Sequence, residues 1–104
     1  MTDLQTLAEQ ARDAGMAAVD AHANAQWKLS AAAVIRELAR RGVPFIGDDV
    51  WDLLDQRQVP PPSSLRALGP LMLAAARAGE IRRTGEFRPS VRSHMSPKPL
   101  WVGV

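Results

Sequence analysis

The chain has 104 residues, of which 46% are hydrophobic, so it can form one small packed domain and is too short for two. It contains no cysteine, which excludes disulfides, thiol nucleophiles and thiolate zinc sites. No apolar run approaches the roughly 18 residues of a membrane span, and the N-terminus lacks the order of a signal peptide, so we expect a cytoplasmic protein without membrane contact.

The net charge of +2 is unevenly distributed along the chain. Residues 1–62 contain six basic and nine acidic side chains, whereas residues 63–104 contain seven basic and only two acidic ones. Such polarity is typical of a chain that presents one end to a polyanion.

An amphipathic helix is predicted at the N-terminus. Thr2 and Gln5 have the spacing of a capping box, and Leu4 and Leu7 begin an apolar stripe that continues in alanines. Because alanine side chains are short, we expect this helix, residues 1–23, to lie close to the domain or to a second copy of itself.

A second helix is predicted after Asn24, a favourable N-cap residue, and Gly42 is expected to end it in the left-handed conformation. Its apolar positions are Trp27, Ala31, Val34, Ile35 and Leu38. Residues 43–46 include a proline and are too few for another helix, so they predict a brief extended segment that can become an edge strand.

The next predicted helix begins at Asp48 and Asp49, whose negative charge suits a helix start. Asp48, Asp52 and Asp55 have the spacing of one helix face. A metal or nuclease site would need further ligands that the spacing does not supply. The expected roles of these aspartates are therefore helix capping and solubility. The sequence predicts neither a bound metal nor a cofactor.

A proline-rich connector, residues 58–62, precedes a third helix that Ser63 or Ser64 caps and Gly79 ends. Pro70 lacks an amide proton and crowds the preceding turn. It therefore predicts either a kink or a regular helix that begins only at residues 69–70.

The last 24 residues change to an extended pattern. Residues 80–83 alternate, residues 84 and 85 can turn, and Phe87 gives a second apolar anchor. Residues 88–99 predict a basic, proline-containing loop, and residues 100–104 a second strand. Trp27, Trp51 and Trp101 are expected to anchor the core, one per element. The predicted fold class is mainly α with a small C-terminal β-hairpin.

The order helix, short strand, helix, helix, hairpin resembles the winged helix-turn-helix family over residues 24–104. The stretches PFIGDDVWDLLD and LRALGPLMLAAARAGEI are also similar to small winged-helix proteins of actinobacteria and their phages. The resemblance implies a support helix at residues 48–56, a recognition helix at 64–78 and a wing at 81–104. Residues 1–23 would be an extra N-terminal helix.

This resemblance and the basic C-terminal third predict a non-catalytic regulator, of a phage or a bacterium, that binds double-stranded DNA. The wing would contact phosphates, and the recognition helix would supply any base preference. The predicted DNA-binding residues are Ser63, Ser64, Arg66, Arg77, Arg82, Arg83, Arg88, Arg92, His94 and Lys98. No residue pattern predicts a catalytic site.

Other functions and roles fit the same residues. Winged helices also dock proteins, and Pro70 and Leu73 on the exposed face of the third helix would suit an adaptor for a host or replication protein. The N-terminal helix would form a homodimer in a DNA-binding regulator and join the docking surface in an adaptor. Solvated charges that protect the hairpin edges are the structural alternative for the wing.

Overall fold

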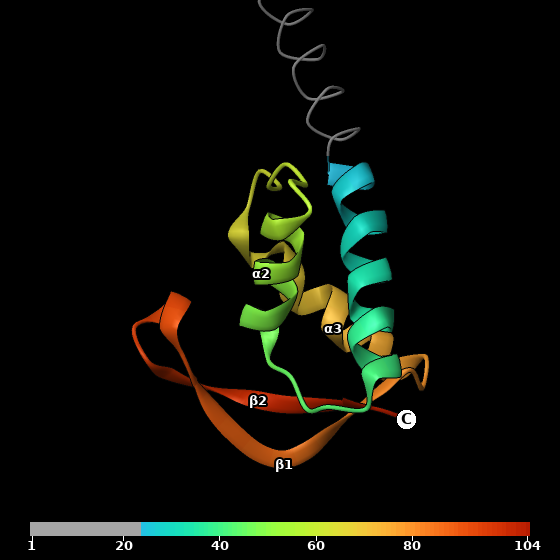
Figure 1. The fold of residues 1–104 in the computed structure, drawn as a ribbon, viewed down its shortest axis with the longest axis vertical. Coiled ribbons are helices and arrows are strands. Elements are labelled where there is room, and N and C mark those ends of the chain that lie inside the picture. The colour runs from blue at the N-terminus through green and yellow to red at the C-terminus, as the bar shows by residue number, and fades with distance from the viewer. Residues whose placement is uncertain (1–23) are drawn as a thin grey trace, which may run out of the picture.

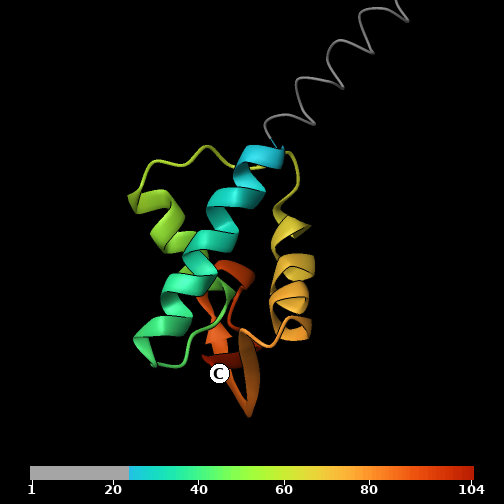
Figure 2. The ribbon, with the colours of Figure 1, turned by 90° about the vertical axis from the view of Figure 1, so that its right-hand side faces the viewer.

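The computed structural model describes residues 24–104, which form three helices and an antiparallel two-stranded hairpin. The helices lie over one face of the hairpin, which forms the base of the molecule (Figure 1). A view from the side shows the same separation of helices and strands (Figure 2). The predicted class, mainly helical with a C-terminal hairpin, is confirmed at this level. The predicted N-terminal helix, residues 1–23, lies outside the described residues.

The first described helix covers residues 24–41 and ends at Gly42, whose φ of 72° confirms the predicted left-handed termination. Trp27 is buried on this helix and stacks on the half-buried Trp51 with ring centroids 5.4 Å apart. Trp101 is also buried. Two of the three tryptophans are therefore core residues, and Trp51 packs against the core from its edge.

Helix α2, Gly47–Gln56, begins as predicted beside two aspartates. The Asp49 carboxylate accepts a hydrogen bond from the Ile46 amide at 2.9 Å, which satisfies a backbone donor at the helix start. Just before α2, Phe45 exchanges two backbone hydrogen bonds of 2.8 Å with Trp101. The predicted edge segment is therefore confirmed as a single bridge to the hairpin.

Helix α3, Leu68–Arg77, is preceded by a 3-10 turn, Leu65–Ala67. The Ser64 hydroxyl caps that turn by accepting from the Arg66 amide at 3.2 Å. The regular helix thus begins slightly before the predicted residues 69–70. Pro70 lies in its first turn, where a backbone amide has no partner within the helix, so the proline costs no hydrogen bond.

The hairpin is longer than predicted. Strands β1, Ile81–Ser90, and β2, Ser96–Gly103, leave only residues 91–95 as a connection, so the expected loop over 88–99 is wrong. The expected turn at residues 84 and 85 is also wrong. Arg83 pairs with Trp101 and Phe87 pairs with Pro99, so three residues of β1 bulge opposite one of β2. Gly85, with φ of 90°, lies in that bulge.

Phe87 is 65% exposed, so its predicted role as an apolar anchor is wrong. The bulge does not reverse the side-chain alternation, because Arg83 pairs with Trp101 and Phe87 with Pro99, which leaves Phe87 on the same sheet face as Ile81. Phe87 is exposed because it lies beyond the part of the hairpin that packs on the core, which includes Ile81 and Trp101 but not Phe87.

Glu37 joins the end of the first helix to the end of α2. Its carboxylate binds Arg41 at 3.1 Å on the same helix and also binds Arg57, which directly follows α2. The hydrogen bond from Arg57 is the main reason why the pKa of Glu37 lies below its ordinary value. Burial opposes this shift, and the charges of both arginines and a hydrogen bond from Arg41 support it.

We expect Glu37→Gln to remove a part of the stability that depends on pH. A carboxyl group with a lowered folded pKa stabilises the fold above its unfolded pKa, and this contribution is lost as the pH falls through the folded value. The wild type should therefore have the higher melting temperature at pH 7, and the difference should begin to shrink near pH about 4 and disappear only once the pH is below the lowered folded pKa of Glu37. Calorimetry over this range measures it. A pH-independent difference would contradict the assignment, and Glu86→Gln is the control because Glu86 forms no ion pair within residues 24–104.

Candidate nucleic-acid interface

The two serines predicted to contact phosphates are used by the fold. The Ser63 amide and hydroxyl both bond to the Asn24 side chain, with the amide contact at 3.0 Å. Asn24 thus links the first helix to the start of α3 instead of using its side chain as the predicted N-cap. Ser64 caps the turn before α3. Both residues are exposed, but their hydroxyl groups already have intramolecular partners.

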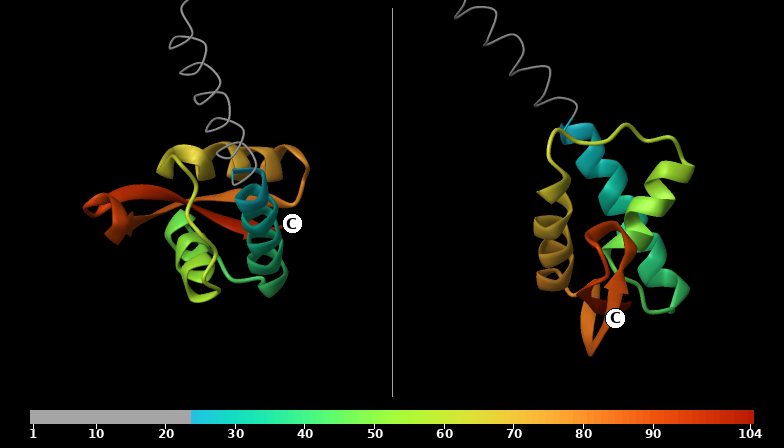
Figure 3. Two further views of the ribbon diagram at one scale, coloured as in Figure 1. Left: turned by 90° about the horizontal axis from the view of Figure 1, so that it is seen from above. Right: turned by 90° about the vertical axis from the view of Figure 1, so that its left-hand side faces the viewer.

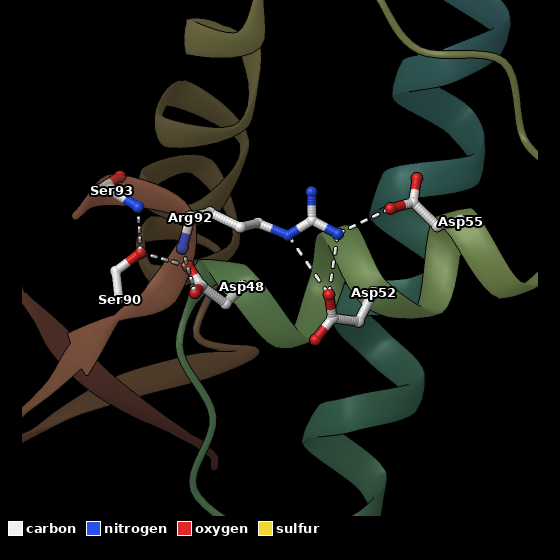
Figure 4. A network of polar contacts seen from close by, with 6 residues as sticks. All are labelled: Asp48, Asp52, Asp55, Ser90, Arg92 and Ser93. Carbon is white, nitrogen blue, oxygen red and sulfur yellow. Dashed lines mark hydrogen bonds and ion pairs between the residues drawn. The ribbon is translucent and has the colours of Figure 1, made fainter. Parts of the chain in front are cut away.

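Two of the predicted wing arginines lie against carboxylates of α2. Arg88 pairs with Asp49, and Arg92 binds Asp52 at 2.8 Å and Asp55 at 2.7 Å (Figure 4). The hydrogen bond with Asp52, followed by that with Asp55, raises the pKa of the Arg92 guanidinium. The structure therefore directs these two cations toward α2 and pairs them internally.

The same face of α2 also holds the backbone of the hairpin turn. Ser90 has no exposed surface, and its hydroxyl donates to Asp48 at 2.6 Å while accepting from the Ser93 amide at 3.2 Å. The second Asp48 oxygen accepts from the Arg92 amide at 3.3 Å. We call this set of contacts from Asp48, Asp52 and Asp55 to residues 90–93 the α2–turn contact (Figure 4).

The α2–turn contact corrects the expected role of the aspartates. Only Asp49 acts in capping, whereas Asp48, Asp52 and Asp55 hold the hairpin turn. The sequence shows that Asp48, Asp52 and Asp55 share one helix face and that Arg88 and Arg92 are four residues apart. It does not show that the two groups lie against each other. Figure 3, right, shows the turn in front of the space between α2 and α3.

Asp48→Ala should lower the free energy of unfolding by about 1–3 kcal/mol, because the buried Ser90 hydroxyl would lose its acceptor. Denaturant unfolding measures the loss. Amide exchange should also accelerate at Met95, whose amide bonds to the Ser90 carbonyl at 2.7 Å. Asp55→Ala is the matched control, since Asp55 is 64% exposed and its ion pair should contribute at most about 1 kcal/mol. Equal effects of the two substitutions would contradict the assigned role of Asp48.

The remaining predicted cations have no carboxylate partner within residues 24–104. Arg66 lies just before α3 and Arg77 on it, Arg82 and Arg83 lie near the open end of the hairpin, and Lys98 lies in the half of β2 nearest the turn. The Arg83 guanidinium lies 5.1 Å from the centre of the Trp101 ring, an arrangement that favours a cation–π contact. Lys28 and Arg40 are also without an ion pair in this part of the chain, but they belong to the first helix.

A groove of about 370 Å³ lies between α3 and the hairpin, and we call it the α3–hairpin groove. Leu65, Gly69 and Leu73 line it on one side, and Arg83 and Lys98 on the other. A second hollow of about 410 Å³ shares Leu73, Arg83 and Trp101 with it and adds Arg77 and Arg82. Four of the five unpaired cations therefore border one hollowed face.

His94 does not line either hollow. It occupies the exposed hairpin turn with a φ of 53°, and Met95 follows with a φ of 65°. Among residues 24–104 no group of histidine and carboxylate side chains could hold a metal ion, and no helix is long and apolar enough to cross a membrane. Comparison with family models, with curated proteins and with solved structures gives no match for this chain.

Proposed function

We propose that the chain is a winged helix-turn-helix protein that binds double-stranded DNA and has no catalytic activity. The element order supports the fold assignment, because a helix, a short edge segment, two helices and a hairpin follow one another. The pairing of Phe45 with β2 also supports it, since the edge segment then extends the hairpin by one short strand. In this arrangement α3 is the recognition helix and residues 81–103 are the wing.

The main support for the proposal is that cations without an ion pair within residues 24–104 gather on α3, its preceding turn and the hairpin, whereas other arginines are bound to carboxylates. Each of five arginines forms an ion pair with a carboxylate, Arg41 and Arg57 sharing Glu37; these arginines are Arg36, Arg41, Arg57, Arg88 and Arg92. Of the five unpaired cations on α3, its preceding turn and the hairpin, four border one hollowed face, namely Arg77, Arg82, Arg83 and Lys98. There they attract a polyanion such as the phosphate backbone.

Phosphate contacts dominate this proposed interface over base contacts. Arg66 and Arg77 are the residues of α3 and its preceding turn that can donate two hydrogen bonds to a guanine. The exposed positions between them are Gly69, Pro70, Leu73 and Ala74, none of which has a side-chain donor. The proposed function is therefore DNA binding with weak sequence selectivity.

The dependence of DNA affinity on salt tests this proposal. Neutralising four or five phosphates should make the logarithm of the affinity fall with the logarithm of salt concentration with a slope of about −4. Titration of a random duplex with the full chain at several salt concentrations, followed by fluorescence anisotropy, gives the slope. The double variant Arg88→Ala with Arg92→Ala should change it by less than about 1, because both arginines already face carboxylates. Absence of duplex binding at low salt would refute the proposal.

A protein adaptor is the second candidate function. Leu65 and Leu73 are 73% and 43% exposed on the same face, and such leucines are more typical of a protein contact than of a DNA-reading surface. If the low-salt titration detects no DNA binding while the protein remains folded, the adaptor becomes the better assignment.

A further inference from the structure

The α3–hairpin groove has two chemically different sides. Its α3 side presents Leu65 and Leu73, both exposed, and its hairpin side presents Arg83 and Lys98. Asp48 and Arg92 also line the groove, but their polar groups are engaged in the α2–turn contact. Its floor includes Trp101 together with apolar side chains that belong to the core. A segment that fits both sides must be apolar on one face and acidic on the opposite face, as an amphipathic acidic helix is.

Residues 1–23 of this chain have that pattern. Leu4 and Leu7 begin an apolar stripe, and Glu9, Asp13 and Asp20 are separated by four and seven residues. At helical spacing these three carboxylates share one face, which lies opposite the two leucines. With Asp3 and a single basic residue, Arg12, the segment has a net charge opposite to that of the hairpin side.

The place where this segment joins the domain favours the same groove. Asn24, the first described residue, is hydrogen-bonded to Ser63. Ser63 lies two residues before Leu65, which lines the groove at the start of α3. A helix of 23 residues would be about 34 Å long, which exceeds the length of α3 and its preceding turn. The segment is therefore attached beside one end of the groove and is long enough to follow it.

We propose that residues 1–23 bind in the α3–hairpin groove of their own chain, with the leucines against Leu73 and the carboxylates facing Arg83 and Lys98. The binding itself does not depend on the DNA-binding proposal. If that proposal also holds, the segment covers two of the cations that DNA needs, and it regulates the interface by competing with the phosphates.

Paramagnetic broadening in the full chain tests the placement. A nitroxide is attached at Gln10→Cys, the sole cysteine of that variant, and amide signals are compared with the label reduced and oxidised. The proposal expects broadening at Leu73, Arg83 and Lys98, and its loss when Leu4→Glu and Leu7→Glu are added. A label at Val43→Cys, which is exposed and outside the groove, is the control.

Two results would overturn the proposal. One is an absence of broadening on α3 and the hairpin. The other is broadening that arises only between molecules. It would appear only when spin-labelled protein is mixed with isotope-labelled protein that carries no spin label, and it would mean that the segment binds the groove of a second copy. Broadening within one molecule that disappears in the Leu4→Glu, Leu7→Glu variant supports it.

DNA titration of the same variant separates this inference from the proposed function. If both hold, Leu4→Glu with Leu7→Glu should raise duplex affinity by roughly 10-fold at low salt, because two phosphate-binding cations become accessible. Broadening in the wild type without any duplex binding would leave the groove assignment intact and refute DNA binding. DNA binding without broadening would support the DNA-binding proposal and refute the placement of residues 1–23 in the groove.

Discussion

Replacing Trp101 with alanine is expected to lower the free energy of unfolding by about 3–5 kcal/mol. Trp101 is 5% exposed and belongs to the core shared by all three helices and the hairpin. Its backbone bonds to Phe45 and its neighbour across the hairpin is Arg83, so the indole lies where the edge segment, β2 and β1 meet. A cavity at this position removes packing from several elements at once, and no single side-chain movement can fill it.

Denaturant unfolding followed by far-ultraviolet circular dichroism measures this loss without relying on tryptophan fluorescence. Trp51→Ala is the matched control, because Trp51 is half-buried and contacts the core from its edge. Its loss should be smaller than that of Trp101. Equal losses for the two tryptophans, or a loss below about 1 kcal/mol for Trp101, would contradict the central position of the indole.

The helices could be predicted from the sequence because their signals are local. Two aspartates mark the start of α2, and Gly42 and Gly79 end helices with φ values of 72° and 76°. The bridge at Phe45 was also predictable, since a short segment bounded by a proline and a glycine fits an edge strand better than a helix.

The length of the hairpin could not be predicted from the sequence, because prolines and glycine usually interrupt a strand. Pro89 pairs with Pro97 inside the hairpin, and Gly85 lies in its bulge. A two-stranded ribbon leaves an unpaired edge on each strand, so a residue without an amide proton is tolerated there. The register shift itself follows from tertiary pairing and has no local signal.

The pairing of the wing arginines with α2 also depends on tertiary structure. Arg92 and its carboxylate partners are 37–40 residues apart, and no local rule relates them. The sequence shows that the last third of the chain is basic, but it does not show which of these cations are paired with carboxylates. In the structure Arg88 and Arg92 pair with carboxylates, whereas the other five cations of this third form no ion pair within residues 24–104.

Simultaneous replacement of Arg77, Arg82 and Arg83 by alanine should weaken duplex DNA binding by roughly 100-fold or more near 100 mM salt. Each lost phosphate contact should also make the salt slope less steep by about 1, so the slope should become less negative by about 3 units. These three arginines border the same hollow and have no carboxylate partner within the described part of the chain. Fluorescence anisotropy with a random duplex measures both quantities.

The triple variant of Arg36, Arg41 and Arg57 is the control, because it removes the same formal charge from arginines that already bind carboxylates. If binding depended only on net charge, both triple variants would lose affinity equally. If it depends on cations gathered at the α3–hairpin face, only the first should show the large change in slope. Circular dichroism must show that both variants are folded, since Arg83 contacts the Trp101 ring. An equal response would refute the proposed interface even if the chain binds DNA, because the binding would then reflect overall charge and not the face built by α3 and the hairpin.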